Sequence, residues 1–492
     1  QYKQRSLLSS KTITTRDTLD STTALASTLS GDTTALYAGQ DIRVMGSNVV
    51  STQLTSLGAG RDLRIEASTE VLNENHIRTE KNSGLFSGGG LGVTLGTQRQ
   101  QTDHDTQSRR AAASTIGGTD GNIALWAGRS YAQHGSDVLA TNGDITLAAQ
   151  QIDILEARET QRSQTDTRFT QSGLTLALSG PVINAVQTTL QMKDASSRTT
   201  DSRMKALAAA NAGMSTYDAT QAINQGQGQT IDGKPGQIVT GTDDKGNATT
   251  RDANAADKVG GLSLTLSVGG SRSQGQVIQT TESSRSSNVS AGHDVLIMAS
   301  GNGPQSTLTI QGSRVAAGAN ANLVAENAIQ LLAARNTADQ HSTNHSSSGS
   351  IGVTVGNNGI GVTASASTAR GGADGDDVTH TQSHVDAGQK LTLNAGGDTT
   401  VKGALAKARQ IEATIGGDLL VESVQDTSTY KSRQRSLGGS ATVGAGGSAS
   451  VNASLSQIDS DFASVMEQTG LKAGDGGFQV SVGGRSEERR VG

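Results

Sequence analysis

The chain has 492 residues, of which 62 are Gly, so glycine occurs at nearly double the ~7% of average usage. Only three residues are Pro, aromatic residues make up 2% and charged residues 17%, which excludes a proline-rich or strongly charged disordered chain. The net charge is −5 and there is no strong basic run, so the signature of a nucleic-acid-binding protein is missing. Without Cys, the chain has neither a disulfide framework nor a cysteine-ligated metal site.

No stretch of about 18 apolar residues occurs, so we expect no transmembrane segment. Gln1 opens on polar sequence without the regions of a signal peptide, and we expect the chain to be an internal piece of a longer protein. Because large rings are scarce, a core must be built from many small aliphatic side chains, which favours an elongated stacked architecture.

A glycine turn followed by a short alternating strand recurs along the chain. Copies lie at residues 38–44, 59–65, 142–147, 291–297, 387–393 and 416–421. Gly39 and Gly60 are 21 residues apart, and this period with one strand per turn indicates a parallel β-solenoid. We expect the glycine to permit a sharp corner and the adjacent Asp or Asn to bond its own backbone. The residues expected to point inward are Ile42, Val44, Leu63, Ile65, Leu391, Leu393, Leu419 and Val421.

A longer unit, a glycine-flanked aliphatic strand, recurs five times. Its copies are marked by Leu91, Leu174, Leu262, Ile351 and Ala441, with spacings of 83, 88, 89 and 90 residues. Strands rich in Ser, Thr, Gln and His lie before and after most copies. We interpret them as extended hairpin flaps at the solenoid edge, polar because both faces meet water.

One segment breaks the repeats. From Asp201 onward, Met204, Leu207, Met214 and Tyr217 follow a helical stripe, which predicts an amphipathic helix. Residues 225–257 are rich in Gly, Gln, Asp and Asn, which is typical of a flexible linker. The predicted organisation is therefore a solenoid over 1–180, a helical and linker insertion over 181–258, and a solenoid over 259–484. The tail 485–492 lacks alternation, resembles translated adaptor sequence, and is excluded from the expected fold.

At the scale of the long modules, the chain resembles the haemagglutinin-repeat region of filamentous haemagglutinin and contact-dependent growth inhibition exoproteins. The most specific match is the segment 461–478, DFASVMEQTGLKAGDGGF. The resemblance implies a right-handed parallel β-helix at the bacterial cell surface, exported by two-partner secretion. It also implies an outer-membrane transporter that acts through a separate N-terminal domain, and a toxin or maturation domain further along the parent chain.

Four groups of polar residues have the composition of a metal or catalytic site, and none is predicted to be one. His341 with His345, and His380 with His384, have the i, i+4 spacing of a helical metal site, but on a strand such side chains lie about 13 Å apart. We therefore predict solvated polar strands without a metal.

The remaining two groups are acidic. The run Asp374, Asp376 and Asp377 is similar to a calcium-binding β-roll turn but occurs once, so we predict a surface loop. Asp103, His104 and Asp105 would alternate between the faces of a strand and not converge. We expect no catalytic residue, cofactor or metal.

The function predicted on these grounds is that of a non-enzymatic, secreted surface stalk in adhesion or in toxin delivery to neighbouring bacteria. The contact elements are expected in the flaps around Gly92, Gly352 and Gly439. A purely structural spacer shares every sequence feature with this prediction. A polysaccharide-processing β-helix enzyme is the other alternative, disfavoured because ten aromatic residues are spread over 492 positions.

Overall fold

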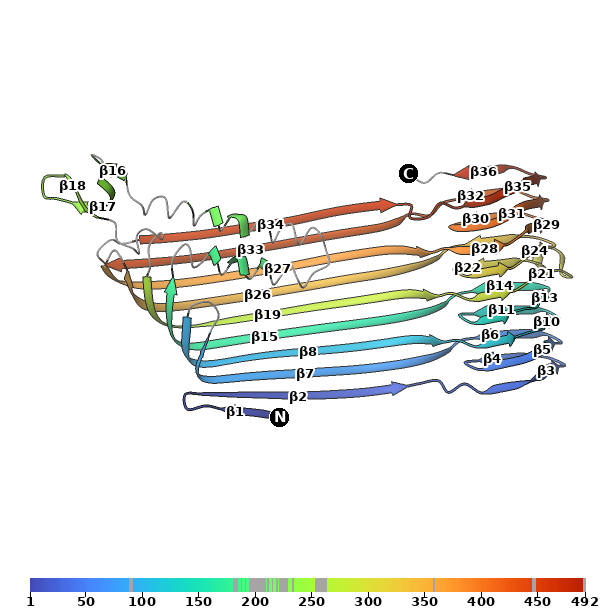
Figure 1. Ribbon diagram of the computed structural model, residues 1–492, viewed down its shortest axis with the longest axis horizontal. Helices are drawn as coiled ribbons and strands as arrows, with labels where there is room; N and C mark the ends of the chain where they lie inside the picture. Colours follow the sequence, from blue (N-terminus) through green and yellow to red (C-terminus); the bar gives the residue numbers. More distant parts are fainter. Residues whose placement is uncertain are drawn as a thin grey trace.

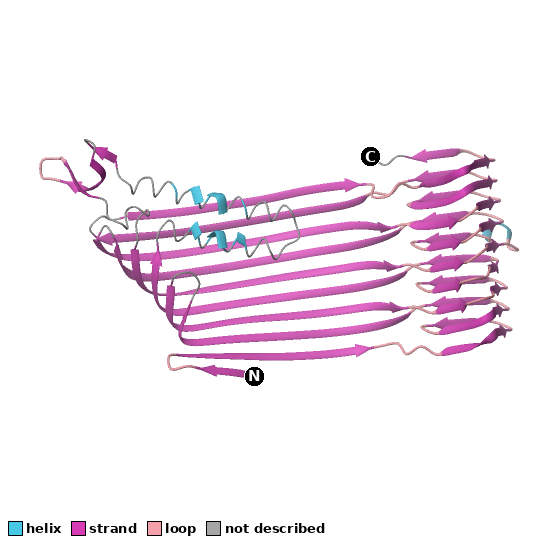
Figure 2. Cartoon of the chain, viewed as in Figure 1, coloured by secondary structure: helices cyan, strands magenta, loops and turns pink. Residues whose placement is uncertain are grey.

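The computed structural model describes residues 1–87, 92–179, 229–231, 234–252, 263–356, 359–444 and 448–489, with scattered residues between 185 and 220. A β-solenoid and a long antiparallel sheet extending from one side of it make up most of these residues (Figure 1). Both parts consist almost entirely of strands (Figure 2). The predicted all-β solenoid with hairpin flaps is confirmed.

The solenoid has three faces of parallel strands. The first contains the initial parts of β3 (Thr28–Ala38), β5 (Asn48–Ala59), β31 (Ala404–Ile415) and β35 (Gly470–Val482), with β9 (Thr115–Gly118), β12 (Asp137–Ala140), β20 (Asn288–Ala291), β23 (Arg314–Ala317) and β28 (Ser383–Ala387) between them. The second contains the later parts of the same four strands, with β10 (Asn122–Ala127), β13 (Ile145–Ala149), β21 (Val295–Ala299), β24 (Asn320–Ala325) and β29 (Lys390–Ala395).

The third face contains one short strand from each coil. These strands are β4 (Ile42–Met45), β6 (Asp62–Glu66), β11 (Ser130–His134), β14 (Gln151–Leu155), β22 (Leu308–Gln311), β25 (Ile329–Leu332), β30 (Thr399–Lys402), β32 (Leu419–Glu422) and β36 (Ser486–Arg489). The short 3-10 helix η2 (Gly303–Gln305) lies before β22. The described chain thus makes nine coils.

Alternate residues of the solenoid strands fill a single apolar core. Ile42, Val44, Leu63, Ile65, Leu391, Leu393 and Leu419 are buried, and Val421 packs against them half-buried, so the predicted register is confirmed. Among the described residues, Tyr131 is the one aromatic side chain in this core. Its hydroxyl donates to Oε1 of Gln133 at 2.9 Å, and burial raises its pKa.

The long strands form one antiparallel sheet beside the solenoid. In spatial order they are β1 (Tyr2–Arg5), β2 (Ser9–Thr22), β7 (Ser68–Ser87), β8 (Gly92–Ala112), β15 (Ala157–Ser179), β19 (Ser263–Arg285), β26 (Ala334–Gly356), β27 (Gly359–Thr381), β33 (Asp426–Gly444) and β34 (Ser448–Ser464). From β7 onward they leave and re-enter the solenoid in pairs, and two coils separate each pair from the next.

This alternation keeps the solenoid and the long sheet aligned along their length. Each coil adds one strand to every solenoid face, which is about 4.8 Å of height, and each pair of long strands adds about twice that to the long sheet. Two coils per pair therefore advance the solenoid and the long sheet by the same distance.

Corner glycines stack where the first face of the solenoid turns into the second. A Cβ at Gly318 would lie 1.9 Å from the carbonyl oxygen of Gly292, and one at Gly388 would lie 2.1 Å from that of Gly318. The coils approach so closely here that only glycine fits.

The aspartates beside these corners bond the neighbouring coil and not their own backbone. Oδ1 of Asp144 accepts from the backbone N–H of Asp294 at 3.0 Å, and Oδ1 of Asp294 accepts from that of Asn320 at 2.8 Å. At the corner between the second and third faces, Asp398 and Asp418 repeat the pattern. These carboxylates join successive coils, which local turn chemistry did not predict.

Asp62 occupies an equivalent corner and is itself buried. Nε of Arg129 donates to its carboxylate at 2.8 Å and Oγ of Ser130 at 2.7 Å. The Arg129 hydrogen bond, supported by Ser130, lowers the pKa of Asp62 to about 2.

Three expectations require revision. Within the predicted linker, β16 (Gln229–Ile231), β17 (Lys234–Thr242) and β18 (Ala248–Asp252) form a small antiparallel sheet, with Asp243 accepting from the backbone N–H of Lys245 and Asn247 in the β17–β18 turn. In the excluded tail, β36 pairs in parallel with β32, because backbone pairing continues without side-chain alternation.

The third revision concerns the five long units spaced 83–90 residues apart, because the strands that carry them do not all run in the same direction. Their markers fall on β15, β26 and β33, which leave the solenoid, and beside β8 and β19, which return to it. Of the predicted helix, Met214 and Tyr217 are helical, while Asp201, Met204 and Leu207 lie outside the described residues.

The stacked glycines generate a matched test. We expect Gly318→Ala to lower the free energy of unfolding by roughly 2 kcal/mol, because the added Cβ overlaps a backbone carbonyl. Gly39→Ala, where a Cβ meets nothing within 4 Å, should change it by less than about 0.5 kcal/mol. Urea denaturation measures both, and equal losses would contradict the stacking argument.

Asp62 predicts a specific acid sensitivity. Its folded pKa lies below the ~3.9 of an unfolded Asp, so the carboxylate stabilises the fold above about pH 4 and ceases to do so as the pH falls toward 2. We expect Asp62→Asn to be less stable than the parent by on the order of 2 kcal/mol at pH 7, and the gap to narrow below pH 4. A gap independent of pH would show that the charge of Asp62 is not responsible.

Candidate functional site

The outer ends of the long strands carry an exposed apolar band on one face of the sheet. Cross-strand pairing aligns Leu95 with Leu174, Leu174 with Val268, and Val268 with Ile351. The apolar band consists of Leu85, Val93, Leu95, Leu174, Leu176, Leu178, Leu264, Leu266, Val268, Ile351, Val353, Val355, Ile360, Val362, Val443 and Val451. Directly paired residues share a face, so these side chains form one surface.

The band is open to solvent over its whole width. Leu176 and Val353 in the middle of the sheet are each 45% exposed, and Val443 near its last strand is 75% exposed. Continuous apolar surface of this size is uncommon on a monomer and marks an interaction surface.

Within the band, small residues create a shallow hollow of about 840 Å³. Its lining includes the aliphatic residues Val268, Ile351 and Val451 and the small residues Gly349, Ala364, Ala366, Gly439, Ala441 and Ala449. This hollow is apolar and offers no titratable group.

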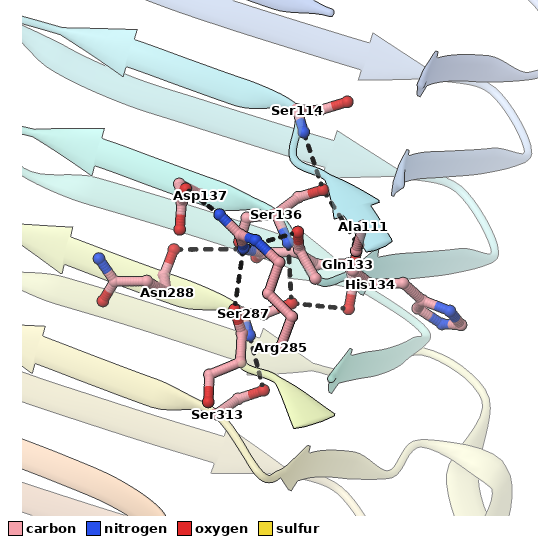
Figure 3. A network of polar contacts seen from close by, with 12 residues as sticks. Ala111, Ser114, Gln133, His134, Ser136, Asp137, Arg285, Ser287, Asn288 and Ser313 are labelled. Atoms are coloured by element: carbon pink, nitrogen blue, oxygen red, sulfur yellow. Dashed lines mark hydrogen bonds and ion pairs between the residues drawn. The ribbon is translucent and has the colours of Figure 1, made fainter. Parts of the chain in front are cut away.

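A buried serine ladder joins the long strands to the solenoid (Figure 3). The backbone N–H of Ser114 donates to Oγ of Ser136 at 3.2 Å, that of Ser136 to Oγ of Ser287 at 3.3 Å, and that of Ser287 to Oγ of Ser313 at 3.2 Å. The backbone N–H of Ser313 in turn donates to Oγ of Ser383. All five serines are buried, so each coil is fixed to the next at this corner.

Arg285, the last residue of β19, connects the long sheet to the same corner. Its Nη1 donates to the carbonyl oxygen of Gly135 at 2.9 Å, and its Nη2 lies 3.4 Å from Oδ2 of Asp137 (Figure 3). Gly135 has a φ of +53°, and a Cβ there would lie 2.3 Å from that of Ala157, where β15 begins. Gly46 and Gly312 occupy the same corner with φ of +54° and +53°.

Three of the four histidines of the candidate metal pairs lie beside carboxylates and not beside one another. Nδ1 of His341 lies 2.5 Å from Oδ1 of Asp374 on the neighbouring strand, and Nδ1 of His380 lies 3.0 Å from Oδ1 of Asp426. Nε2 of His384 lies 3.5 Å from Oε2 of Glu467. His345 faces Arg370 across β26 and β27. Among the described residues, no three metal-binding side chains converge.

The two acidic groups lie on strands. Asp374, Asp376 and Asp377 are within β27, so the predicted surface loop is wrong, because pairing with β26 continues through all three. Asp103 accepts a hydrogen bond from Nδ2 of Asn75, while His104 contacts Thr165 and Thr106, so this group is divided as predicted. The sequence shows the aliphatic strands of the apolar band, but it does not show that their side chains assemble on one face of the sheet.

A family model described as "Hemagglutinin repeat" matches residues 8–98, 95–243 and 266–437 of the chain. The chain is 37% identical to "Deoxyribonuclease CdiA" of Dickeya dadantii, with 98% of this chain and 14% of that protein aligned. It is 36% identical to "tRNA nuclease CdiA" of Escherichia coli strain NC101, with 99% and 14% aligned. It is also 35% identical to "Deoxyribonuclease CdiA" of Yersinia pseudotuberculosis, with 91% and 40% aligned.

The chain thus spans about a seventh of the length of the first two relatives. No solved structure matches it. In the described part of the chain, no helix has the length and apolar character needed to cross a membrane.

The serine ladder predicts a large effect from a small truncation. Ser287→Ala removes a hydroxyl that donates to the carbonyl oxygen of Leu155 at 2.6 Å and accepts from the N–H of Ser136. We expect a loss of about 1–3 kcal/mol in the free energy of unfolding, because both backbone groups stay buried without that partner. Ser436→Ala, at the exposed Ser436–Ser454 pair, is the matched control and should change it by less than about 0.5 kcal/mol. Similar losses in urea denaturation would refute the ladder's role.

Proposed function

The chain belongs to the hemagglutinin-repeat family, and from this we propose that it is a non-enzymatic repeat stalk of a secreted bacterial surface exoprotein. It acts in adhesion or in contact-dependent toxin delivery to neighbouring bacteria. Its export partner is an outer-membrane two-partner secretion transporter, and its second partner is the surface of the neighbouring cell.

The comparison between relatives supports a non-enzymatic role. One relative is named a deoxyribonuclease and another a tRNA nuclease, yet both align with nearly the whole chain at almost equal identity. A region that carried the nuclease site would be expected to differ between enzymes with such different substrates. We therefore assign the nuclease activities to other parts of those proteins.

The apolar band favours a contact role over that of a passive spacer. A spacer needs only the solenoid core and polar surfaces, whereas the outer strand ends here expose aliphatic side chains such as Leu266, Val353 and Val362. The exposed part of each of these side chains gains no burial from the described residues, so the stability of the fold alone does not account for the band. The band is accordingly the surface through which the stalk engages its partner.

The decisive experiment uses the parent exoprotein in co-culture. We compare the intact protein with an in-frame deletion of this region, and with a replacement by an unrelated β-solenoid of equal length. We expect both changes to reduce adhesion or contact-dependent killing, while a toxin expressed directly inside a cell stays active. Full activity of the replacement would reduce the region to a spacer, and full activity of the deletion would refute the proposal.

A milder variant, Leu266→Ser with Val353→Ser and Val362→Ser, tests the band alone. These side chains are about half exposed and pair with one another across the strands, so the unfolding midpoint should fall only slightly while delivery or adhesion falls strongly. Ser273→Ala with Ser346→Ala and Ser436→Ala, on the opposite face of the same sheet, is the matched control. Equal activity of the two variants would contradict a contact role for the band. Nuclease, lyase or hydrolase activity of the purified chain would refute the non-enzymatic assignment.

A further inference from the structure

A belt of basic side chains crosses the long sheet on the same face as the apolar band, nearer the solenoid. Seven consecutive strands, β7 to β33, each contribute one basic residue to it. The cationic belt consists of Lys81, Arg99, Arg168, Arg272, His345, Arg370 and Arg435. All seven side chains are exposed.

Strand register places these residues in two adjacent rows. In the first row Lys81 pairs with Arg99, and Arg99 is followed by Thr170, Arg272 and Ser347. In the second row Arg168, Gln274, His345, Arg370 and Arg435 are successive cross-strand neighbours. Neither row contains an Asp or Glu on any of the seven strands.

The arrangement is electrostatically unfavourable for the isolated chain. Lys81 lies directly opposite Arg99, and Arg370 lies directly opposite Arg435. Like charges in such positions destabilise a sheet. Within the described chain, none of the seven forms an ion pair with a carboxylate, although eleven Lys or Arg residues elsewhere do.

The spacing of the belt fits a linear polyanion better than a single small ion. Neighbouring strands are about 4.8 Å apart, so seven strands extend the belt over roughly 29 Å. Hydroxyl and amide side chains lie between the cations in the same rows, among them Thr170, Ser347 and Gln274. Such groups donate to and accept from sugar hydroxyls. The two rows contain no Phe, Tyr or Trp, the large aromatic side chains on which proteins typically stack the bases of single-stranded nucleic acids.

We propose that the cationic belt binds a linear anionic polysaccharide, which lies across the strands with its acidic groups on the guanidinium and ammonium groups. Arg forms paired hydrogen bonds with carboxylate and similar oxyanions, which suits this role. The site goes beyond the proposed stalk function and would stand if the co-culture experiment failed. It is absent from the sequence as a motif, because its members are spread over more than 350 residues.

The test uses the whole chain and heparin as the anionic polysaccharide. The belt variant combines Arg99→Gln, Arg272→Gln, Arg370→Gln and Arg435→Gln. The matched control removes the same number of positive charges from exposed solenoid positions, with Arg64→Gln, Lys407→Gln, Arg409→Gln and Lys472→Gln. We expect heparin to bind the parent in a salt-dependent manner. Heparin should bind the belt variant at least about tenfold more weakly, and its affinity should depend less steeply on salt. The control should bind as the parent does.

Further probes decide between ligand classes, and a stability measurement guards against misfolding. Neutral dextran should not bind. The unfolding midpoint of the belt variant should equal or exceed that of the parent, because like-charge neighbours have been removed. Equal heparin affinity of parent and belt variant, or an equal loss in the control, would overturn the proposal. Binding to an oligothymidylate or to phosphatidylglycerol vesicles without binding to heparin would overturn it as well.

Discussion

The structure depends on one constraint, the equal rise of two β-architectures built by the same chain. Two solenoid coils and one pair of long strands each occupy about two strand spacings, so parallel stacking in one part stays aligned with antiparallel pairing in the other. The corner interactions maintain this alignment. Stacked glycines such as Gly318 set the closest approach between coils, and Asp144 and Asp294 join each coil to the next. Ser136, Ser287 and Arg285 fix the point where long strands enter the solenoid.

The same alignment creates the surfaces of the long sheet. A continuous register across the eight strands from β7 to β34 places aliphatic side chains from each module in one apolar band, and basic side chains in a second band closer to the solenoid. Neither surface exists within a single hairpin. Because each module adds another segment to both bands, a repeat protein of this kind gains contact surface in proportion to its length.

The local parts of the fold were predictable from sequence, and the non-local parts were not. Alternation after each glycine identified inward residues such as Leu63 and Leu393, and strand geometry separated Asp103 from His104. The pairing of β15 with β19 depends on residues more than 80 positions apart, so the regular module spacing was misread. Strand β36 was missed because backbone pairing needs no apolar pattern, and the cationic belt because its rows exist only in the assembled sheet.

The most direct test of the central constraint changes the number of coils. Removing residues 287–312 deletes the single coil β20–β22, whereas removing 287–382 deletes two coils with the pair β26 and β27. The account predicts that the larger deletion keeps slow amide hydrogen exchange in the long strands β15 and β19. The smaller deletion should lose it there, because two long strands then compete for one level of the sheet. Equal protection in both variants would contradict the account.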